Sequence, residues 1–443
     1  MSDFAYGTHT ADPEHGALRV RGACATNSSR NPRWTNLYIK MSVTDPVIAS
    51  RTIEHIVEKY SGELVDLRRD LHAHPELSWA ENRTTQIVAA RLAEAGARVT
   101  RLEGTGLVAE VGEGGPVVAL RADLDALPVE DTTDEPWRSL TPGVAHACGH
   151  DVHTAGLVGA SLALAETHAR GQLPGVVRLF FQPAEEVMPG GALRMMEAGA
   201  LDDVRRIFSL HCDPSLDVGE IGLRDGPLTG AADALSVELT GRGGHTSRPH
   251  LTEDLTFALG KVITELPAIV SRRLDPRAGV SLVWGMVRAG SAHNVIPGRG
   301  RVAGTVRMLD QVAWDEAESL VRGVIDEIVS PYGIEAVVDY RRGVPPVVND
   351  LESTRILGLA IENALGPEGR VATTQSLGGE DFGWFLDRVP GAMARLGTRT
   401  PGGPTYDLHH GNLRVDERAT CIASRVLAEA ALEGLLAASE LHG

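Results

Sequence analysis

Residues 117–128 read Val-Val-Ala-Leu-Arg-Ala-Asp-Leu-Asp-Ala-Leu-Pro, an apolar run that passes into alternating charged residues. The first four residues are all apolar, which is typical of a strand buried on both faces of a parallel sheet. Such a strand delivers Asp123 and Asp125 to its carboxyl end, where open α/β sheets hold their sites. This stretch therefore predicts an α/β fold with a functional site at one edge of a mainly parallel sheet.

The same layout occurs twice more along the chain. An apolar strand at 176–181 ends in Gln-Pro-Ala-Glu-Glu, and a shorter one at 206–210 ends in His-Cys-Asp-Pro. Helical periodicity fills the segments between the strands, and two further short strands precede residue 117. The expected helices are 46–71, 81–95, 154–167 and 191–198, and the expected short strands are 97–102 and 106–111. Strands that alternate with helices indicate a largely parallel sheet with helical cover.

The pattern changes near Gly230. Strands are expected at 234–240, 280–287, 300–308 and 334–340, and helices at 254–273 and 314–329. This β-α-β-β-α-β order is the ferredoxin-like arrangement, so we expect an inserted α+β domain over 230–342. The α/β pattern resumes with helices at 351–365, 382–385 and 417–439 and a strand at 392–396. The first domain is therefore expected in two parts, 46–229 and 343–443.

Residues 1–45 differ from the rest of the 443-residue chain. They are polar, rich in Gly, Pro, Asn and Ser, and lack the apolar core of a secretory signal. We expect a poorly ordered N-terminal extension, or sequence upstream of a true start at Met41.

Composition and net charge limit the kinds of partner and the compartment that we expect for this chain. The net charge of −17 argues against nucleic acid and anionic membranes, and no run of about 18 apolar residues suggests a membrane span. The four cysteines are too scattered for a disulfide framework, which favours a reducing compartment and hence the cytoplasm.

Ligand-type residues cluster at several strand ends and loops. Residues 146–153 read His-Ala-Cys-Gly-His-Asp-Val-His, so Cys148 and His150 flank a glycine. Thiol and imidazole groups are ligands that borderline-soft divalent metals favour. Glu185-Glu186, His211 and the pair His409-His410 follow further along the chain. Each segment alone is weak evidence for a metal site. If all of them meet at one edge of the sheet, together they predict such a site.

The adjacent glutamates suit a particular chemistry. One can hold a metal while its neighbour acts as general base toward a metal-bound water. Without a cation between them, two neighbouring carboxylates repel each other and raise each other's pKa. In the inserted segment, glycine-rich loops carry His245 and Asn294, which can donate to a developing oxyanion; ordinary turn chemistry is the alternative.

Taken together, these motifs resemble the metal-dependent aminoacylase/carboxypeptidase-like amidohydrolases, which include hippurate hydrolase and the indoleacetyl-amino-acid hydrolases. The matching segments run in the family's order from about residue 60 to the end. They are Arg121–Pro128, His146–Thr154, Gln182–Glu186, Gly243–His250, Asn294–Pro297 and Glu380-Asp381-Phe382.

The resemblance implies a metallopeptidase-like catalytic domain with a dinuclear metal site. It assigns Glu185 as the base, Asp125 as its orienter and His245 as a transition-state stabiliser. The implied ligands are Cys148, His150, Glu186, His211 and His409. The inserted domain would be a lid and the surface of a homodimer. This branch of the family usually follows the last ligand with Ser or Thr and then Pro, whereas this chain has His410-Gly411, so both His409 and His410 stay open, with His409 at the motif position.

The expected function is cleavage of the amide bond of N-acyl amino acids, such as N-acetyl or N-benzoyl compounds, by metal-activated water. Two divalent ions per subunit are expected, manganese or zinc, with cobalt or nickel as further options. Asn294 is expected to contact substrate, and Arg307 to bind its free carboxylate. Glycine- and proline-bearing junctions at 226–227 and 343–346 are expected to act as hinges.

Two alternatives remain. A thiol hydrolase with Cys148 as nucleophile and His150 as base leaves Glu185, Glu186 and His211 without a role. A non-catalytic metal-binding protein on the same scaffold does not need a second glutamate. The sequence does not identify the acyl group, the amino acid or the native metal.

Overall fold

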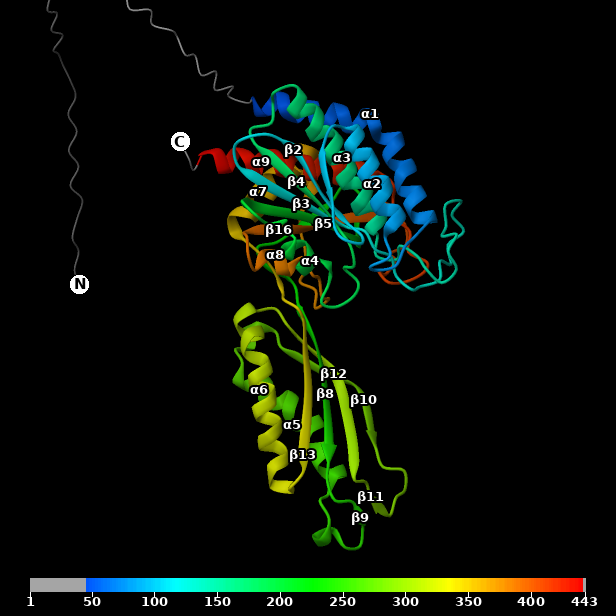
Figure 1. The fold of residues 1–443 in the computed structure, drawn as a ribbon, viewed down its shortest axis with the longest axis vertical. Coiled ribbons are helices and arrows are strands. Elements are labelled where there is room, and N and C mark those ends of the chain that lie inside the picture. The colour runs from blue at the N-terminus through cyan, green and yellow to red at the C-terminus, as the bar shows by residue number, and fades with distance from the viewer. Residues whose placement is uncertain (1–44, 441–443) are drawn as a thin grey trace, which may run out of the picture. The chain divides into compact units, whose positions relative to one another are not determined.

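The computed structural model describes residues 45–440 (Figure 1). The expected N-terminal extension lies outside this range except for Asp45. No helix of the described part is long and apolar enough to cross a membrane.

The larger sheet has eight strands in the order β1-β2-β4-β3-β5-β16-β6-β15. Its pairs β3–β4, β3–β5, β5–β16 and β6–β15 are parallel, and β1–β2, β2–β4 and β6–β16 are antiparallel. The strands are β1 (Arg98–Arg101), β2 (Leu107–Gly112), β3 (Val117–Asp123), β4 (Val176–Gln182), β5 (Val204–Asp217), β6 (Ile221–Leu223), β15 (Arg370–Ala372) and β16 (Gly391–Arg399). The expected parallel-rich sheet is confirmed.

Strand β3 is buried on both faces, as its apolar run predicts. Val118 and Leu120 belong to a core shared with one set of helices, whereas Ala119 belongs to a second core on the other face. The helices of the first set are α1 (Pro46–Ala73), α2 (Asn82–Glu94), α3 (His150–Ala169), α7 (Leu351–Leu365) and α9 (Arg418–Glu440); α4 (Gly191–Glu197) and α8 (Gly383–Leu386) pack on the second face.

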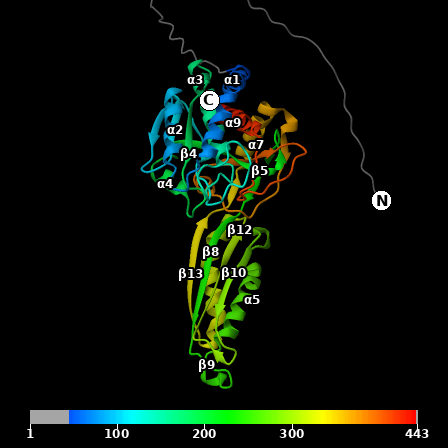
Figure 2. The ribbon, with the colours of Figure 1, turned by 90° about the vertical axis from the view of Figure 1, so that its right-hand side faces the viewer.

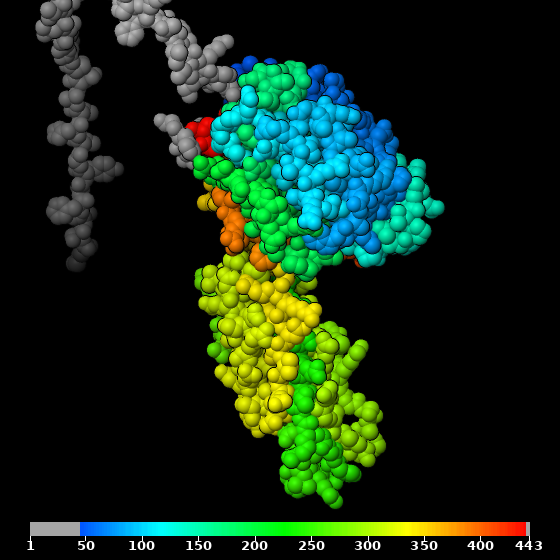
Figure 3. Space-filling model, viewed as in Figure 1, coloured from blue at the N-terminus to red at the C-terminus, as the bar shows by residue number. Residues whose placement is uncertain are grey.

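The segment near residues 230–344 forms a four-stranded antiparallel sheet in the order β10-β12-β8-β13. Its elements are β8 (Ala231–Thr240), α5 (Leu255–Arg273), β10 (Ser281–Ala289), β12 (Arg299–Met308), α6 (Gln311–Val329) and β13 (Glu335–Val344). Both helices pack on the same face through one apolar core, and Figure 2 shows α5 beside the strands of this sheet. This order confirms the ferredoxin-like arrangement. The segment, green to yellow in Figure 3, gathers into one region of the surface.

Short paired strands mark both junctions between the two sheets. β7 (Gly226–Thr229) and β14 (Val347–Asn349) pair antiparallel, with Val348 opposite Pro227. The expected hinge at 226–227 is therefore part of a two-stranded ribbon. A second small ribbon, β9 (Gly244–His245) with β11 (Val295–Ile296), follows the far end of β8.

The longest departure from the sequence expectation is β5, which continues to Asp217 instead of ending at residue 210. Its pairing with β3 stops at Ser209, but its pairing with β16 continues to Asp217. Because β16 supplies hydrogen-bond partners, the strand persists through His211. His211 therefore lies within a strand, in the part of β5 that continues beyond its last residue paired with β3.

Candidate metal centre

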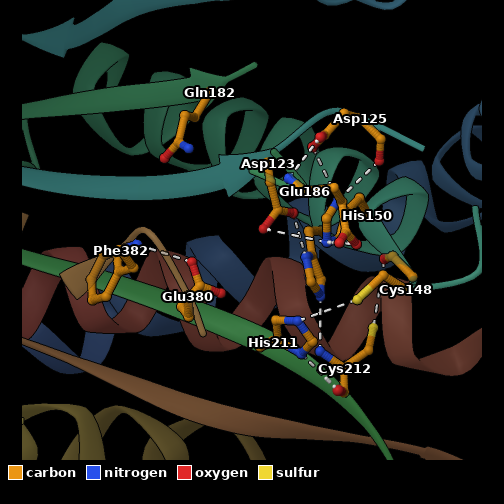
Figure 4. Close-up of polar contacts among 12 residues, drawn as sticks. Asp123, Asp125, Cys148, His150, Gln182, Glu186, His211, Cys212, Glu380 and Phe382 are labelled. Atoms are coloured by element: carbon orange, nitrogen blue, oxygen red, sulfur yellow. Dashed lines mark hydrogen bonds and ion pairs between the residues drawn. The ribbon is translucent and has the colours of Figure 1, made fainter. Parts of the chain in front are cut away.

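Three side chains converge from the turn before α3, from the first residue of α3 and from β5 (Figure 4). Ligand atoms of Cys148, His150 and His211 lie within 4.8 Å of one another, and all three residues are buried. Cys148 Sγ is 3.6 Å from His211 Nε2. Cys148 and His150 flank Gly149, whose positive φ of 84° opens α3 and whose missing Cβ leaves room for Cys212.

Both of these imidazoles are oriented by the backbone. His150 Nδ1 donates to the carbonyl oxygen of Asp125 at 2.9 Å, and His211 Nδ1 donates to that of Cys212 at 2.8 Å. Because each Nδ1 is occupied, each Nε2 is left as an acceptor facing the cluster, which is the usual preparation of a histidine for a metal.

Glu186 and His409 complete a second, overlapping group with Cys148, again within 4.8 Å. His409 Nε2 lies 3.4 Å from Glu186 Oε1, and His150 Nε2 lies 3.8 Å from the same oxygen. The backbone N–H of His409 donates to Ala147 at 2.7 Å, which fixes this loop against the start of α3. The structure thus brings together all five side chains predicted as ligands, with His409 rather than His410 in the cluster.

The local chemistry fits a divalent cation. His150 Nε2 and Glu186 Oε1 are buried without a hydrogen-bond partner, although both face the cluster. Burial opposes charge on His150, but Asp123 and Cys148 outweigh it and raise the pKa of this imidazole. Contacts with Cys148 and Glu186 raise the pKa of His409 to about 10. Both imidazoles therefore lie in an electronegative environment, which a bound cation would neutralise.

Glu185 lies beside Glu186 and shares His150 with it as a neighbour, but it also has neighbours of its own. Its carboxylate is within 4.8 Å of those of Glu380 and Asp381. Burial, then Glu380 and Glu186, raise its pKa well above the ordinary range. A half-buried carboxylate with a raised proton affinity beside the ligands is suited to accept and return a proton.

The two aspartates after β3 have separate partners. Asp123 accepts from Arg121 at 2.7 Å and from His153 at 2.6 Å. The other ring nitrogen of His153 also has a partner, because Nε2 accepts from the Cys212 backbone N–H at 2.8 Å. Asp123 Oδ2 also lies 3.7 Å from His150 Nε2, so Asp123, His150 and His153 form a further group of ligand-type side chains beside the predicted ligands.

Asp125 Oδ2 accepts from Ser78 at 2.7 Å and from the backbone N–H of Glu186 at 2.9 Å. Its contacts are thus with the neighbour of Glu185. The role of Asp125 in orienting Glu185 itself stays a prediction.

Sequence reasoning missed the buried network around Arg121. This guanidinium donates to Asp123, Gln182 and Asp381, and it lies 3.0 Å from Glu380. It connects two parts of the chain 260 positions apart. The motif residues 380–382 were a signal for this network, but no spacing rule pairs them with Arg121.

The residues predicted to act from the inserted domain are not part of the ligand cluster. His245 and Asn294 are exposed on adjacent segments joined by the Thr246 N–H to Asn294 carbonyl bond of 3.2 Å. His245 Nδ1 accepts from the Ser247 N–H at 3.1 Å. Arg307 pairs in register with Ala232, at the opposite end of β8 from His245. It donates to the carbonyl of Leu377 and lines a cavity of about 500 Å³.

A thiol, imidazoles and carboxylates around one point, beside a further half-buried glutamate, are the groups that a metal-dependent hydrolase uses. The model of the peptidase family M20/M25/M40 matches residues 119–433 of this chain. The YXEP protein of Bacillus subtilis, a dinuclear metal-binding peptidase of family M20, has 35% sequence identity and a TM-score of 0.75, over 86% of this chain and 99% of that one. The chain belongs to the peptidase family M20/M25/M40.

Two relatives extend the comparison. The N-acetylcysteine deacetylase of Bacillus subtilis is 38% identical over 375 residues, which cover 83% of this chain and 96% of that protein. The putative glutamate–cysteine ligase 2-3 of Rhodococcus jostii is 44% identical over 422 residues, which cover 95% of this chain and 52% of that protein. This chain therefore spans about half the length of the Rhodococcus relative.

Proposed function

We propose that this protein hydrolyses the amide bond of N-acyl amino acids. The observation that carries the proposal is the pairing of Glu185 and Glu186, in which Glu186 faces the ligand cluster and the half-buried Glu185 lies between that cluster and the carboxylates of Glu380 and Asp381, with a raised pKa. The name of the deacetylase relative supports an acetylated amino acid, and N-acetylcysteine is the first compound to test.

The ligand set that we propose accommodates two divalent ions and consists of Cys148, His150, Glu186, His211 and His409. When bound, the ions supply a more acidic water and a Lewis acid for the acyl carbonyl. The mixture of sulfur, nitrogen and oxygen donors suits zinc or manganese, with cobalt or nickel as possible replacements.

In this proposal Glu185 performs the proton transfers. Its carboxylate takes a proton from the attacking water and later gives that proton to the nitrogen of the leaving amine. The water oxygen bonds to the acyl carbon, the C–N bond breaks, and the products are a carboxylic acid and a free amino acid. The raised pKa of Glu185 favours holding the proton between these two steps.

Arg307 is proposed to bind the free carboxylate of the substrate, because a guanidinium matches a carboxylate with two parallel hydrogen bonds. It shares its cavity of about 500 Å³ with Met188, two residues beyond Glu186. Met188 therefore connects this cavity with the loop that carries both glutamates.

The placement of His245 favours a homodimer. His245 follows one end of β8, whereas Arg307 pairs at the other end, and a ten-residue strand spans roughly 33 Å. One substrate of amino-acid size cannot contact both residues of the same subunit. We therefore propose that His245 and Asn294 donate to the oxyanion in the site of a second copy of this chain.

The direct test of the proposed activity is a substrate panel. Purified protein is incubated with N-acetyl, N-benzoyl and indoleacetyl amino acids in the presence of manganese or zinc, and release of the free amine is measured. We expect turnover of N-acetyl or N-benzoyl compounds. The proposal fails if no member of the panel is hydrolysed with any metal.

A further inference from the structure

Glu81 is a buried acid outside the ligand set, and it joins three loops. Its side chain is 0% exposed. Oε1 accepts from the backbone N–H groups of Trp79 at 3.0 Å and Ala184 at 2.8 Å, and Oε2 accepts from the hydroxyl of Thr105 at 2.6 Å. All of its contacts therefore lie at the edge of the sheet from which Glu185 and Glu186 project.

Capping of the adjacent helix does not explain Glu81. It stands at the N-cap position of α2, but its side chain makes no hydrogen bond to that helix. Glu76 does this instead, by accepting from the N–H groups of Arg83 at 2.9 Å and Thr84 at 2.8 Å. Glu81 is thus free to face the glutamate loop.

The residue that Glu81 holds has an unusual backbone. Ala184 has a φ of 54°, in the left-handed region that a residue with a Cβ avoids. Such a conformation persists only when the surroundings hold it in place. Both backbone polar groups of Ala184 are fixed, its N–H by Glu81 and its carbonyl by the N–H of Gly191 at 3.0 Å.

The two neighbouring glutamates consequently have different anchors. Asp125 holds the backbone N–H of Glu186, and Glu81 holds the residue directly before Glu185. We propose that Glu81 is a positioning residue: it fixes the left-handed turn at Ala184 and so aims Glu185 at the water, while Asp125 keeps Glu186 in place. The inference rests on the proposed role of Glu185 as the base.

Four variants separate this role from a general effect on the fold. Glu81→Met keeps the side-chain length but removes the acceptor for Ala184. Glu81→Gln keeps an oxygen for Trp79 and Ala184, and its amide can donate to Thr105. Thr105→Val removes the hydroxyl partner of Glu81 and leaves the bond to Ala184, so it is the matched control. Glu81→Asp keeps the charge but has a side chain that is one methylene shorter. If Glu81→Met does not fold, Glu81→Asp tests the positioning role in its place.

We measure kcat, KM, bound metal and deuterium uptake of the peptide containing residues 182–192. Displacement of a reacting group by about 1 Å can lower the rate about 10²-fold. Glu81→Met is therefore expected to lower kcat by about 10²-fold, with KM and metal content within about twofold and faster exchange in this peptide. Glu81→Asp should lose about tenfold, whereas Glu81→Gln and Thr105→Val should stay within about threefold of the wild type.

Three results overturn the proposal: an unchanged kcat in Glu81→Met, loss of metal in that variant, or a defect of equal size in Glu81→Gln. If Glu81→Met does not fold, an unchanged kcat in Glu81→Asp overturns it. Failure of the proposed function is recognised separately, because the wild type then hydrolyses no N-acyl amino acid. The exchange measurement still reports in that case whether Glu81 holds the 182–192 loop.

Discussion

At the scale of single residues, Glu185 and Glu186 have identical side chains and different surroundings. Both lie near His150, but Glu186 Oε1 also faces His409, whereas the carboxylate of Glu185 also faces Glu380 and Asp381. A group among ligands holds a cation, whereas a group among other carboxylates holds a proton more firmly. Their environments therefore divide the two roles.

Glu185→Gln tests this division. The amide keeps the shape of the side chain but cannot accept the proton from water. We expect bound metal to stay at the wild-type level while kcat falls about 10²–10⁴-fold. Elemental analysis and turnover are measured on the same sample. Loss of metal in Glu185→Gln together with retained metal in Glu186→Gln would reverse the assignment.

Cys148→Ser tests the thiol as a ligand. An alcohol is a much poorer anionic ligand than a thiol near neutral pH, so metal affinity should fall by more than about tenfold. Competition with a chelator of known affinity gives the change. An inactive variant with unchanged affinity would instead favour the alternative in which Cys148 is a nucleophile.

The sequence predicted which side chains gather, because ends of parallel strands meet at one edge. It did not predict what holds them there. The bond from Arg121 to Asp381 joins positions 260 apart, and the bond from Glu81 to Ala184 joins positions 103 apart. Side-chain hydrogen bonds of this kind depend on the tertiary packing. They therefore correspond to no periodicity or spacing in the sequence.

At the scale of elements, helices and longer strands were predictable, and the three-residue strands β6 and β15 were not. The apolar periodicity of α5 and α6 gave both helices to within a few residues. β6 and β15 have three residues each, too few for an alternating pattern. The length of β5 depends on β16, which follows it by more than 170 positions.

The contact between α9 and α1 predicts a pH effect on stability. Glu429 of α9 is fully buried and accepts from Ser50 Oγ at 2.6 Å. Burial raises the pKa of Glu429 to about 7. The folded state thus binds this proton more tightly than the unfolded state, so the stabilisation is present at low pH and is lost as pH rises through about 7.

Glu429→Gln should therefore gain stability relative to the wild type between pH 5 and pH 8, by up to roughly 3 kcal/mol. Thermal unfolding at several pH values measures the difference. Glu58→Gln, at an exposed position of α1, is the control. A difference between Glu429→Gln and the wild type that stays constant across this range would contradict the expectation.

At the scale of the whole molecule, the homodimer that we propose raises the question of which subunit's site contains His245. His245→Ala should lower kcat about 10²–10³-fold with metal content intact, because it removes a donor to charge that develops only in the transition state. Arg307→Ala should instead raise KM about 10–100-fold for carboxylate substrates and much less for their amides.

Mixed dimers answer the question. If His245 acts in the partner's site, a dimer of one His245→Ala and one Glu185→Gln subunit contains one complete site. Co-expression of the two differently tagged variants, followed by purification through both tags, should then restore up to about half of the wild-type activity. Hybrid dimers without recovered activity would place His245 in the site of its own subunit.

The most direct test of the whole account is removal and return of the metal. The protein is treated with a chelator, freed of it, and assayed for hydrolysis of N-acetyl amino acids before and after titration with manganese, zinc, cobalt or nickel. Hydrolysis that depends on metal predicts that activity disappears with the metal and returns as two equivalents per subunit bind. Full activity in the metal-free protein would contradict it and favour a thiol hydrolase.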